Sequence, residues 1–366
     1  MKIFIVGLGT ICEPLARLFL EVKNQLGIEE VIIHKNTPEL QCRGMLTRFH
    51  QFGARLAVFE NKRADFGELV RPAGFGPAYT FEEALERADV VIDCTKEKVG
   101  RQLKEKYYQH INFGKKCGFI AQGSEKGFGK PYAYGINDDA LVLEEDRFIQ
   151  VVSCNTHQLL CILQTLVLYY EGADNLVKGR FHLDRRASDI SQTESTVGVE
   201  VGSPIHQMFG SHQGEDAARV LATLAIKNMN IHTTADKLNN PFMHTVGFDL
   251  TLKKPLPGSD KKHEAETRFR VNPLTAVTYL QTNNEVFGEG RDWGHFGRIL
   301  NQTVVCLPSL EVLEDGHEVI GRCFTPQDGN ALLSSVAATL WFMDPSSYRQ
   351  RMEQFFHKLP FLFDEV

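Results

Sequence analysis

The sequence lacks the features that mark several broad classes of protein. No C-x-x-C pair occurs among its cysteines, which argues against a zinc ribbon and against a small secreted domain held by disulfides. Positive charge is not in excess, since 40 Lys and Arg stand against 46 Asp and Glu, a net charge of −6. A partner such as nucleic acid or an anionic membrane is therefore not expected. The eight cysteines are Cys12, Cys42, Cys94, Cys117, Cys154, Cys161, Cys306 and Cys323.

Long hydrophobic runs are also missing. The longest uncharged apolar run, Ala331–Met343, is shorter than the about 20 residues that cross a bilayer. The apolar start, Lys2–Val6, is interpreted as a buried strand and not as a signal peptide, because two glycines and an amphipathic helix follow at once. We therefore expect a cytoplasmic protein without a transmembrane segment.

Short apolar strands alternate with amphipathic helices over the first 150 residues. This alternation predicts an α/β fold with a doubly wound parallel sheet of the Rossmann type. The expected strands are Lys2–Val6, Val31–Ile33, Val90–Asp93, Gly118–Ala121 and Gln150–Ser153. The expected helices are Pro14–Val22, Thr80–Arg87 with a Thr80/Glu83 capping box, Val99–Tyr108 and a long helix after Cys154.

The pattern changes after about residue 175, as expected for a chain whose 366 residues suggest two or three domains. Arg180–Arg185 and His244–Leu252 have the alternation of strands, and Pro255–Arg268 is a charged stretch expected to be rich in loops. Helices are expected again at Ala331–Met343 and Tyr348–Phe356. A second, α+β domain is predicted.

A glycine turn joins the first strand to the first helix. Gly7, Gly9 and Cys12 occupy the three glycine positions of a G-x-G-x-x-G pattern, with a small residue in place of the third glycine. Such a turn lets a pyrophosphate approach the helix N-terminus. Dinucleotide binding is the favoured interpretation, and a simple turn is the alternative.

The second strand ends without the acidic residue that usually holds the ribose of NAD. Lys35, Asn36 and Thr37 stand there instead and could bind a 2′-phosphate. The prediction is that NADP serves at least as well as NAD; the alternative is an ordinary solvated lysine.

Cys154 has the most informative setting of the cysteines. It follows a strand and opens a helix, where free backbone N–H groups and the helix dipole stabilise a thiolate. We predict that Cys154 is a nucleophile. Cys94, Cys117 and Cys161 are interpreted as buried structural cysteines.

The segment Val151–Thr156, V-V-S-C-N-T, resembles the nucleophile segment of archaeal-type (type II) glyceraldehyde-3-phosphate dehydrogenases. Other motifs follow in the order of that family up to about residue 250. They are G-L-G-T-I at 7–11, H-K-N-T-P at 34–38, V-V-I-D-C-T at 90–95, A-Q-G-S-E-K at 121–126, D-R-R-A-S-D at 184–189, G-S-H-Q-G-E-D at 210–216 and F-M-H at 242–244.

This resemblance implies a dinucleotide-binding domain at 1–153, completed by a C-terminal helical segment at about 326–366, and a catalytic domain at 154–325. It implies a homotetramer. No metal ion is expected, because no His, Cys or carboxylate cluster has the spacing of metal ligands. The resemblance also implies phosphorylating oxidation of an aldehyde, through a thiohemiacetal and a thioester on Cys154 that inorganic phosphate cleaves. The implied cofactor-binding residues are Gly7, Gly9, Thr10, Ile11, Lys35, Asn36, Thr37, Cys94, Thr95, Gln122 and Gly123.

The resemblance also assigns the remaining site residues. His244 matches a general base, although its parity with buried strand positions also fits a core histidine, and His212 resembles an anion-binding histidine that competes for the role of base. Ser153, Asn155 and Thr156 would contact the substrate beside the nucleophile. Arg185 and Arg186 are candidates for its phosphate, but alternation along a strand makes it unlikely that both face the site.

Two motifs depart from the family and leave the substrate open. His157-Gln158 replaces Thr-Gly after the nucleophile segment, and Glu215 adds an acid near a predicted phosphate site. The favoured substrate is glyceraldehyde 3-phosphate. The alternatives are a related cysteine-dependent semialdehyde dehydrogenase or acyl-phosphate reductase, and a non-catalytic nucleotide-binding paralogue.

Overall fold

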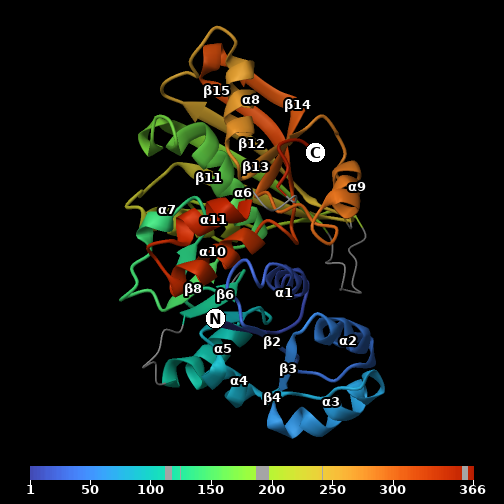
Figure 1. Ribbon diagram of the computed structural model, residues 1–366. Helices are drawn as coiled ribbons and strands as arrows, with labels where there is room; N and C mark the ends of the chain where they lie inside the picture. The colour runs from blue at the N-terminus through green and yellow to red at the C-terminus, as the bar shows by residue number, and fades with distance from the viewer. Residues whose placement is uncertain (112–117, 124, 187–197, 241, 357–361) are drawn as a thin grey trace. The chain divides into compact units, whose positions relative to one another are not determined.

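The computed structural model describes residues 1–111, 118–123, 125–186, 198–240, 242–356 and 362–366. Cys117 and residues 187–189 of the D-R-R-A-S-D motif lie outside the described residues. The chain forms two compact units (Figure 1). The first comprises Met1–Lys130, Val142–Val151 and Ser335–Met352, and the second comprises Pro131–Leu141, Val152–Ser334 and Glu353–Val366.

Eight of the described strands form one sheet in the order β4-β3-β2-β1-β5-β6-β8-β7. All pairs from β4 to β8 are parallel, and helices join the strands from β1 to β6, which confirms the predicted α/β fold. The last predicted strand ends at Val151, two residues early, because Ser153 instead caps the following helix. The strands are β1 Lys2–Val6, β2 Glu30–His34, β3 Arg55–Val58, β4 Tyr79–Thr80, β5 Val90–Asp93, β6 Gly118–Gln122, β7 Lys130–Tyr132 and β8 Phe148–Val151.

Three of the described helices of the first unit, α1, α4 and α5, lie where the sequence predicts a helix, whereas α2 and α3 were not predicted. The helix after the glycine turn carries Pro14 in its first turn, where the missing N–H costs nothing. Thr80 and Glu83 form the predicted capping box, since the Thr80 side chain accepts from the Glu83 N–H and the Glu83 carboxylate from the Thr80 N–H. The helices are α1 Cys12–Glu21, α2 Arg43–Gln51, α3 Arg63–Val70, α4 Phe81–Arg87 and α5 Val99–Lys106.

Residues from the end of the chain complete the first unit. They belong to α10 (Leu332–Met343) and α11 (Tyr348–Phe356). A Cβ atom at Gly118 of β6 would lie 2.1 Å from the ring of Phe342, so α10 packs directly on the sheet backbone. The Gln122 side chain donates to the Ser335 hydroxyl at 2.7 Å. The last strands of the sheet therefore depend on a segment more than 200 residues further along the chain.

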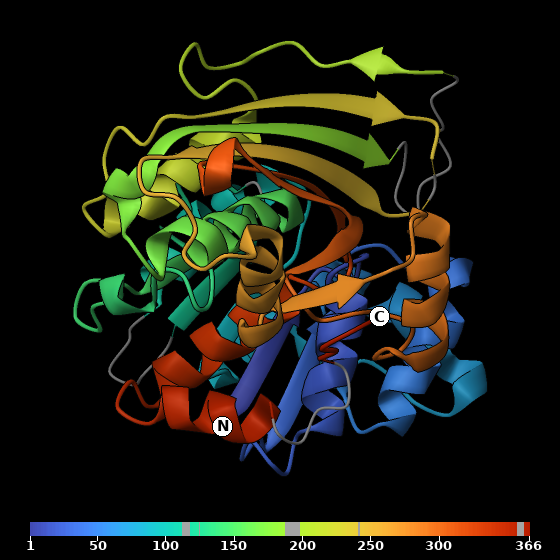
Figure 2. The ribbon, with the colours of Figure 1, turned by 90° about the horizontal axis from the view of Figure 1, so that it is seen from above.

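The second unit contains a mixed sheet in the order β10-β11-β9-β12-β15-β14-β13. The outer pairs β11–β9 and β13–β14 are parallel, whereas β9, β12, β15 and β14 run antiparallel to their neighbours in that series. Figure 2 shows the long strands β11, β9 and β12 side by side. The strands are β9 Leu176–Arg186, β10 Glu200–Val201, β11 Ile231–Leu238, β12 His244–Leu252, β13 Thr275–Thr278, β14 Thr303–Leu313 and β15 Glu318–Thr325.

Helices cover one face of this sheet. Side chains from three of them join alternate residues of β9, β12 and β15 in one apolar core. One of these helices replaces the loop expected at Pro255–Arg268: Asp260 caps it by accepting from the His263 N–H, and Glu264 pairs with Arg268 one turn later. The helices are α6 Cys154–Leu163, continued by a π-helical turn Gln164–Leu168, α7 His212–Thr223, α8 Lys261–Val271 and α9 Asn283–Trp293.

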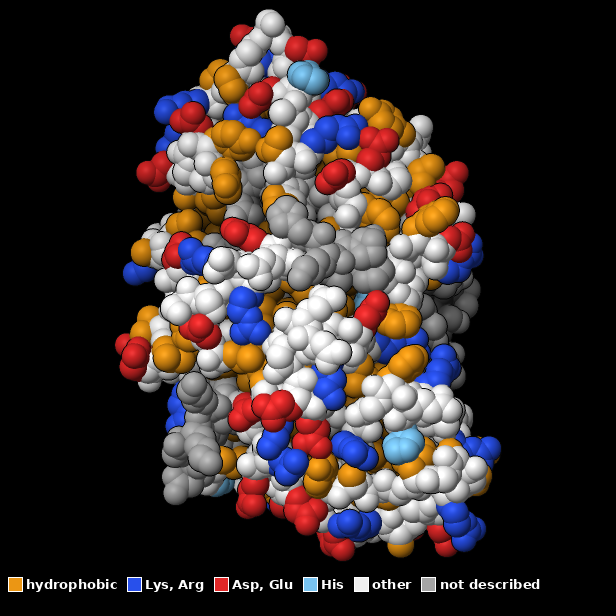
Figure 3. Space-filling view, in the orientation of Figure 1, with side chains coloured by type: hydrophobic (Ala, Val, Ile, Leu, Met, Phe, Trp, Pro, Cys, Tyr) orange, Lys and Arg blue, Asp and Glu red, His pale blue; other side chains and the backbone are white. Residues whose placement is uncertain are grey.

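The surface agrees with the balanced composition. On the face seen in Figure 3, the described Lys and Arg side chains are interspersed with Asp and Glu. None of the described helices combines the length and the apolar character that crossing a membrane requires.

Candidate active site

Residues predicted to bind the cofactor follow the carboxyl ends of parallel strands in the first unit. Gly7 follows β1, Lys35 follows β2, Cys94 follows β5 and Gly123 follows β6. The carboxyl ends of parallel strands share one edge of a sheet, and doubly wound folds bind nucleotides at that edge. The predicted cofactor residues are thus gathered at the edge where such a ligand is bound.

Gly7 lies where the chain that follows β1 comes close to the chain that follows β5. Its φ of +86° favours glycine, and a Cβ atom there would lie 3.1 Å from Thr95 Cγ2 and 3.2 Å from the Cys94 carbonyl oxygen. By contrast, no atom lies within 4 Å of a Cβ built on Gly9, and Ile11 gives α1 no side-chain cap. Small residues and an uncapped helix start fit the pyrophosphate of a dinucleotide.

Two polar side chains at this edge, Gln122 and Lys35, could contact other parts of a bound dinucleotide. The Gln122 Oε1 atom is buried without a hydrogen-bond partner among the described residues, so it can accept from a bound ligand. Lys35 lies 3.6 Å from Glu39 and is half-buried, whereas Asn36 and Thr37 are exposed. The residues present therefore fit a dinucleotide. Lys35 follows β2, at the strand end where the ribose of such a cofactor is usually held.

Cys154 is the first residue of α6 and is partly exposed. The preceding Ser153 is the N-cap, and its hydroxyl lies 3.4 Å from the Thr156 N–H and 2.9 Å from the Thr156 hydroxyl. A helix start held in this way presents its first side chain to the end of the helix dipole, where an anion is stabilised. Asn155 and Thr156 are buried, so their side chains hold the helix start.

A turn after β15 holds α6 in the second unit. The Asn330 amide donates to the Cys154 carbonyl oxygen at 2.9 Å and to the Gln302 carbonyl oxygen at 3.1 Å. Thr325 lies 3.4 Å from the Asn155 side-chain oxygen and pairs in register with His244 across β15 and β12. The nucleophile helix and His244 are thereby connected through one turn.

His244 is the first residue of β12 and is only 6% exposed. Its Nδ1 atom accepts a hydrogen bond from the Arg186 backbone N–H at 2.8 Å. Burial, and then the charges of Arg186 and Arg185, lower the pKa of His244 to about 3. The imidazole is therefore neutral at pH 7, with its proton on Nε2, and Nε2 is a hydrogen-bond donor.

The two arginines at the end of β9 differ in their partners. The Arg186 side chain is 2% exposed, lies 3.2 Å from the Asp328 carboxylate and donates to the Phe242 carbonyl oxygen at 3.3 Å. The Arg185 Nε atom is buried and has no hydrogen-bond partner among the described residues. Asp184 pairs in register with Thr245, so Arg185 and His244 are the next residues along these two strands. Arg186 is thus engaged by Asp328, and Arg185 stays a candidate for binding an anionic substrate group.

The sequence is similar to those of known dehydrogenases. No family model matches the chain. Proteins named glyceraldehyde-3-phosphate dehydrogenase do match: the one from Metallosphaera sedula is 27% identical over 321 residues, which cover 87% of this chain and 86% of that protein. Over most of its length the chain is therefore similar to archaeal proteins of this name. The relative from Methanococcoides burtonii is 33% identical over 237 residues.

The extent of the match varies among these dehydrogenases. The chain spans 62% of the length of the relative from Pyrobaculum islandicum, at 29% identity, and 65% of that from Methanococcoides burtonii. Both shares are below two thirds. The similarity to these dehydrogenases thus extends over part of their length only.

The departures from the dehydrogenase motif at His157 and Gln158 lie inside the second unit. The two ring nitrogens of His157 lie 3.0 Å from the Ser153 carbonyl oxygen and 2.8 Å from the Ser334 hydroxyl, and burial lowers its pKa to about 4. The Gln158 amide donates to Thr303 at 2.9 Å, and its oxygen accepts from Thr325. Both side chains are fully buried and hydrogen-bonded, so they brace α6.

His212 opens α7 beside β11, whereas His244 lies on β12. The His212 side chain is half-buried, as is that of Glu215 in the first turn of α7. The preceding Ser211 ties the helix start to β11, donating to the Thr233 carbonyl oxygen at 3.0 Å. His212 therefore belongs to a separate helix terminus, and its role stays a prediction.

Sequence reasoning missed three residues of this arrangement. They are Thr325, Asp328 and Asn330, which together hold His244, Arg186 and Cys154. The only local signal was the run T-P-Q-D-G-N, which is typical of a turn but carries no hint of its distant partners.

The other cysteines give a mixed outcome. Cys161 is buried, as predicted for a structural residue, but Cys94 is only half-buried at the cofactor edge. No cluster of three or more metal-ligating side chains occurs within the described part of the chain.

Proposed function

We propose that this protein catalyses the NAD(P)-dependent, phosphorylating oxidation of an aldehyde, with glyceraldehyde 3-phosphate as the favoured substrate. The observation that carries the proposal is the second-unit arrangement in which Cys154 opens α6 and one turn connects it to His244 and Arg186. The nucleotide-type edge of the first unit and the similarity to archaeal dehydrogenases support the same conclusion.

The nucleophile in this proposal is the Cys154 thiolate. Its sulfur forms a bond to the aldehyde carbon, and the carbonyl electron pair moves to oxygen to give a thiohemiacetal alkoxide. A bound nicotinamide ring supplies the acceptor for the hydride that leaves this carbon. Loss of hydride gives a thioester on Cys154, and attack by inorganic phosphate yields the acyl phosphate and regenerates the thiolate.

His244 serves in this scheme as a hydrogen-bond donor. Its Nδ1 atom already accepts from the Arg186 N–H, so the nitrogen that could take up a proton is occupied, and the Nε2–H can stabilise the alkoxide. An alkoxide formed from a thiolate needs no further base before hydride leaves. This role differs from the predicted general base, for which His212 remains the other candidate.

Arg185 is proposed to bind the anionic group of the substrate. Its buried Nε has no partner among the described residues, while Asp328 offsets the charge of Arg186. A single available guanidinium also suits a carboxylate, which favours a cysteine-dependent semialdehyde dehydrogenase or acyl-phosphate reductase as the second candidate function.

The test is oxidation of glyceraldehyde 3-phosphate with NADP or NAD, with and without inorganic phosphate, followed by the absorbance of the reduced nicotinamide. Phosphate-dependent turnover should fall by at least about 10³-fold in Cys154→Ser. Cys42→Ser is the matched control, because Cys42 donates to the Glu39 carbonyl oxygen in the first unit and a serine keeps that bond. Turnover without phosphate would assign water as the acceptor. No turnover with either cofactor would redirect the assay to semialdehydes.

Two substitutions separate the possible roles of His244. His244→Gln keeps an N–H donor but no proton acceptor of suitable pKa, whereas His244→Phe removes both. If His244 is a donor, the Gln variant should retain kcat within about tenfold of the wild type and the Phe variant should lose about 10²-fold to 10³-fold. Equal losses of kcat in both variants would instead indicate that His244 is the general base.

The remaining features carried over from the relatives are also proposals. We infer a cytoplasmic homotetramer that uses NADP at least as well as NAD. Light scattering of the purified chain measures the oligomeric state directly, and a monomer would remove that part of the proposal.

A further inference from the structure

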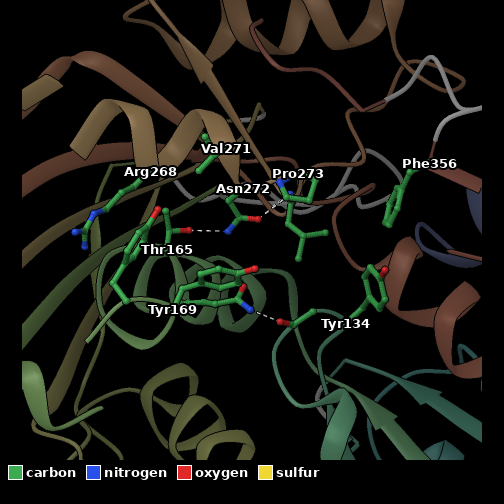
Figure 4. A pocket seen from close by; sticks show the side chains of 12 residues that line it. Tyr134, Thr165, Tyr169, Arg268, Val271, Asn272, Pro273 and Phe356 are labelled. Atoms are coloured by element: carbon green, nitrogen blue, oxygen red, sulfur yellow. Dashed lines mark hydrogen bonds between the residues drawn. The ribbon is translucent and has the colours of Figure 1, made fainter. Parts of the chain in front are cut away.

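A cavity of about 380 Å³ lies within the second unit, away from the proposed catalytic residues. Figure 4 shows Tyr134 and Phe356 on one side of it and Thr165, Arg268 and Asn272 on the other. Its volume falls within the range of about 300 to 1,000 Å³ that is usual for small-molecule sites. Neither Cys154 nor His244 lines it, so it is a separate cavity.

One wall of the cavity is the π-helical turn that continues α6. The Gln164 side chain in this turn donates through Nε2 to the Gly135 carbonyl oxygen, while its Oε1 atom is buried without a partner among the described residues. A buried acceptor left unpaired costs free energy, which a ligand carrying an N–H group can recover. Single π-helical turns also occur frequently at functional sites.

Aromatic rings supply the rest of the wall. The Tyr134 and Phe356 rings lie 5.6 Å apart, and Tyr169 is 77% exposed beside the opening. On the opposite side the Arg268 guanidinium lies 3.7 Å over the Tyr170 ring. Such surfaces favour a planar ring, which can stack on an aromatic face or on a guanidinium plane.

The charge of the cavity is balanced. Arg268 is 4% exposed and pairs with Glu264 at 2.8 Å, and it also donates to the Leu166 carbonyl oxygen at 3.4 Å. Asn272 is likewise engaged, since it donates to Thr165 and accepts from the Leu274 N–H. The wall thus contains a matched cation, aromatic faces and one unused acceptor.

We propose that this cavity binds a small, planar, uncharged heteroaromatic compound that donates an N–H group to Gln164 Oε1. Adenine has this chemistry and is the probe for the test. Its binding to the full-length protein is measured by isothermal titration calorimetry, first for the wild type and then for two cavity variants and a surface control.

Val271→Trp narrows the opening at a position that is 63% exposed, so it leaves the core intact and should abolish detectable binding. Gln164→Leu removes the acceptor and should weaken binding about fivefold. The control Gln102→Leu makes the same exchange on the exposed surface of α5 and should bind as the wild type does. Circular dichroism verifies that each variant is folded.

The result that supports the proposal is wild-type binding that is lost in Val271→Trp and weakened in Gln164→Leu. Absence of adenine binding to the wild type would overturn it. Binding that survives unchanged in both cavity variants would also overturn it, because the probe would then occupy another site such as the nucleotide edge. Neither readout depends on aldehyde turnover, so the outcome is independent of the proposed activity.

Discussion

The starts of α1 and α6 are two helix N-termini built in different ways. At α1 the turn contains Gly7 and Gly9, and the residue before the helix gives no side-chain cap. At α6 the Ser153 side chain caps the helix and the Asn330 amide holds its first carbonyl. The first site is made from backbone and keeps space for a ligand, whereas the second is made from side chains and holds one thiol in place. Substitutions should therefore act by steric intrusion at the first site and by broken polar contacts at the second.

The largest expected effect concerns the buried ion pair between Arg186 and Asp328 in the second unit. Arg186→Met removes the cation that lies 3.2 Å from the buried Asp328 carboxylate, which should lower the free energy of unfolding by about 3 to 5 kcal/mol. Arg185→Met should cost less than about 1 kcal/mol but raise KM for the aldehyde at least about tenfold. Urea denaturation and steady-state kinetics measure the two effects. Similar stability losses in both variants would contradict the distinction between the two arginines.

Two glycine-to-alanine substitutions test the turn before α1. Gly7→Ala should destabilise the protein by about 1 to 2 kcal/mol, because the new Cβ meets Thr95 and Cys94 at an unfavourable positive φ. Gly9→Ala meets no atom within 4 Å and should leave the thermal midpoint unchanged while weakening NADP binding about tenfold. Unchanged NADP affinity in Gly9→Ala would reduce this segment to an ordinary turn.

Buried histidines in both units should make the stability of the protein sensitive to acid. Burial lowers the pKa of His34 in the first unit to about 3, and those of His244 and His157 in the second to about 3 and about 4. The unfolded chain takes up these protons below about pH 6.5 but the folded protein does not, so stability is lost as the pH falls from about 6.5 towards 4. Each imidazole contributes at most about 1.4 kcal/mol per pH unit.

His34→Phe isolates the contribution of the first unit. The His34 ring contacts the rings of Phe4, Phe59 and Phe81, and neither of its nitrogens has a hydrogen-bond partner among the described residues. Phenylalanine should therefore fit and should reduce the slope of unfolding free energy against pH. Urea titrations between pH 7 and 4.5 measure this slope, with His263→Phe on the exposed surface of α8 as the control. An unchanged slope would show that His34 is not kept neutral.

The smallest expected effect concerns cofactor choice at Lys35, which follows β2. Lys35→Ala should raise KM for NADP about fivefold and leave KM for NAD unchanged, because only the 2′-phosphate needs the cation. Glu39→Gln removes the acid 3.6 Å from Lys35 and should shift the preference further towards NADP. A strong preference of the wild-type protein for NAD would contradict the assignment of Lys35.

Local patterns were enough to predict most of the first unit. The capping box at Thr80, the buried strand Val90–Asp93 and the glycine turn at Gly7 are all encoded within a few consecutive residues. The helix α8 was missed because its charged residues mask the periodicity, although the Asp260 cap and the Glu264–Arg268 pair stabilise it.

The candidate site was predictable only in part, because its decisive contacts span long separations in the sequence. Alternation indicates that only one of Arg185 and Arg186 faces the site, but the choice depends on Asp328, 142 residues beyond Arg186. The proton position on His244 depends on the Arg186 N–H, 58 residues away. Neither partner leaves a trace in the local pattern.

The contact between Gly118 and Phe342 has a consequence for how the chain folds during synthesis. At a translation rate of about 5 to 20 residues per second, roughly 10 to 45 s pass between the emergence of β6 and that of α10. During this interval the Gly118 backbone lacks the Phe342 ring that packs on it in the finished protein. We therefore expect this part of the sheet to reach its final packing only after α10 has been synthesised.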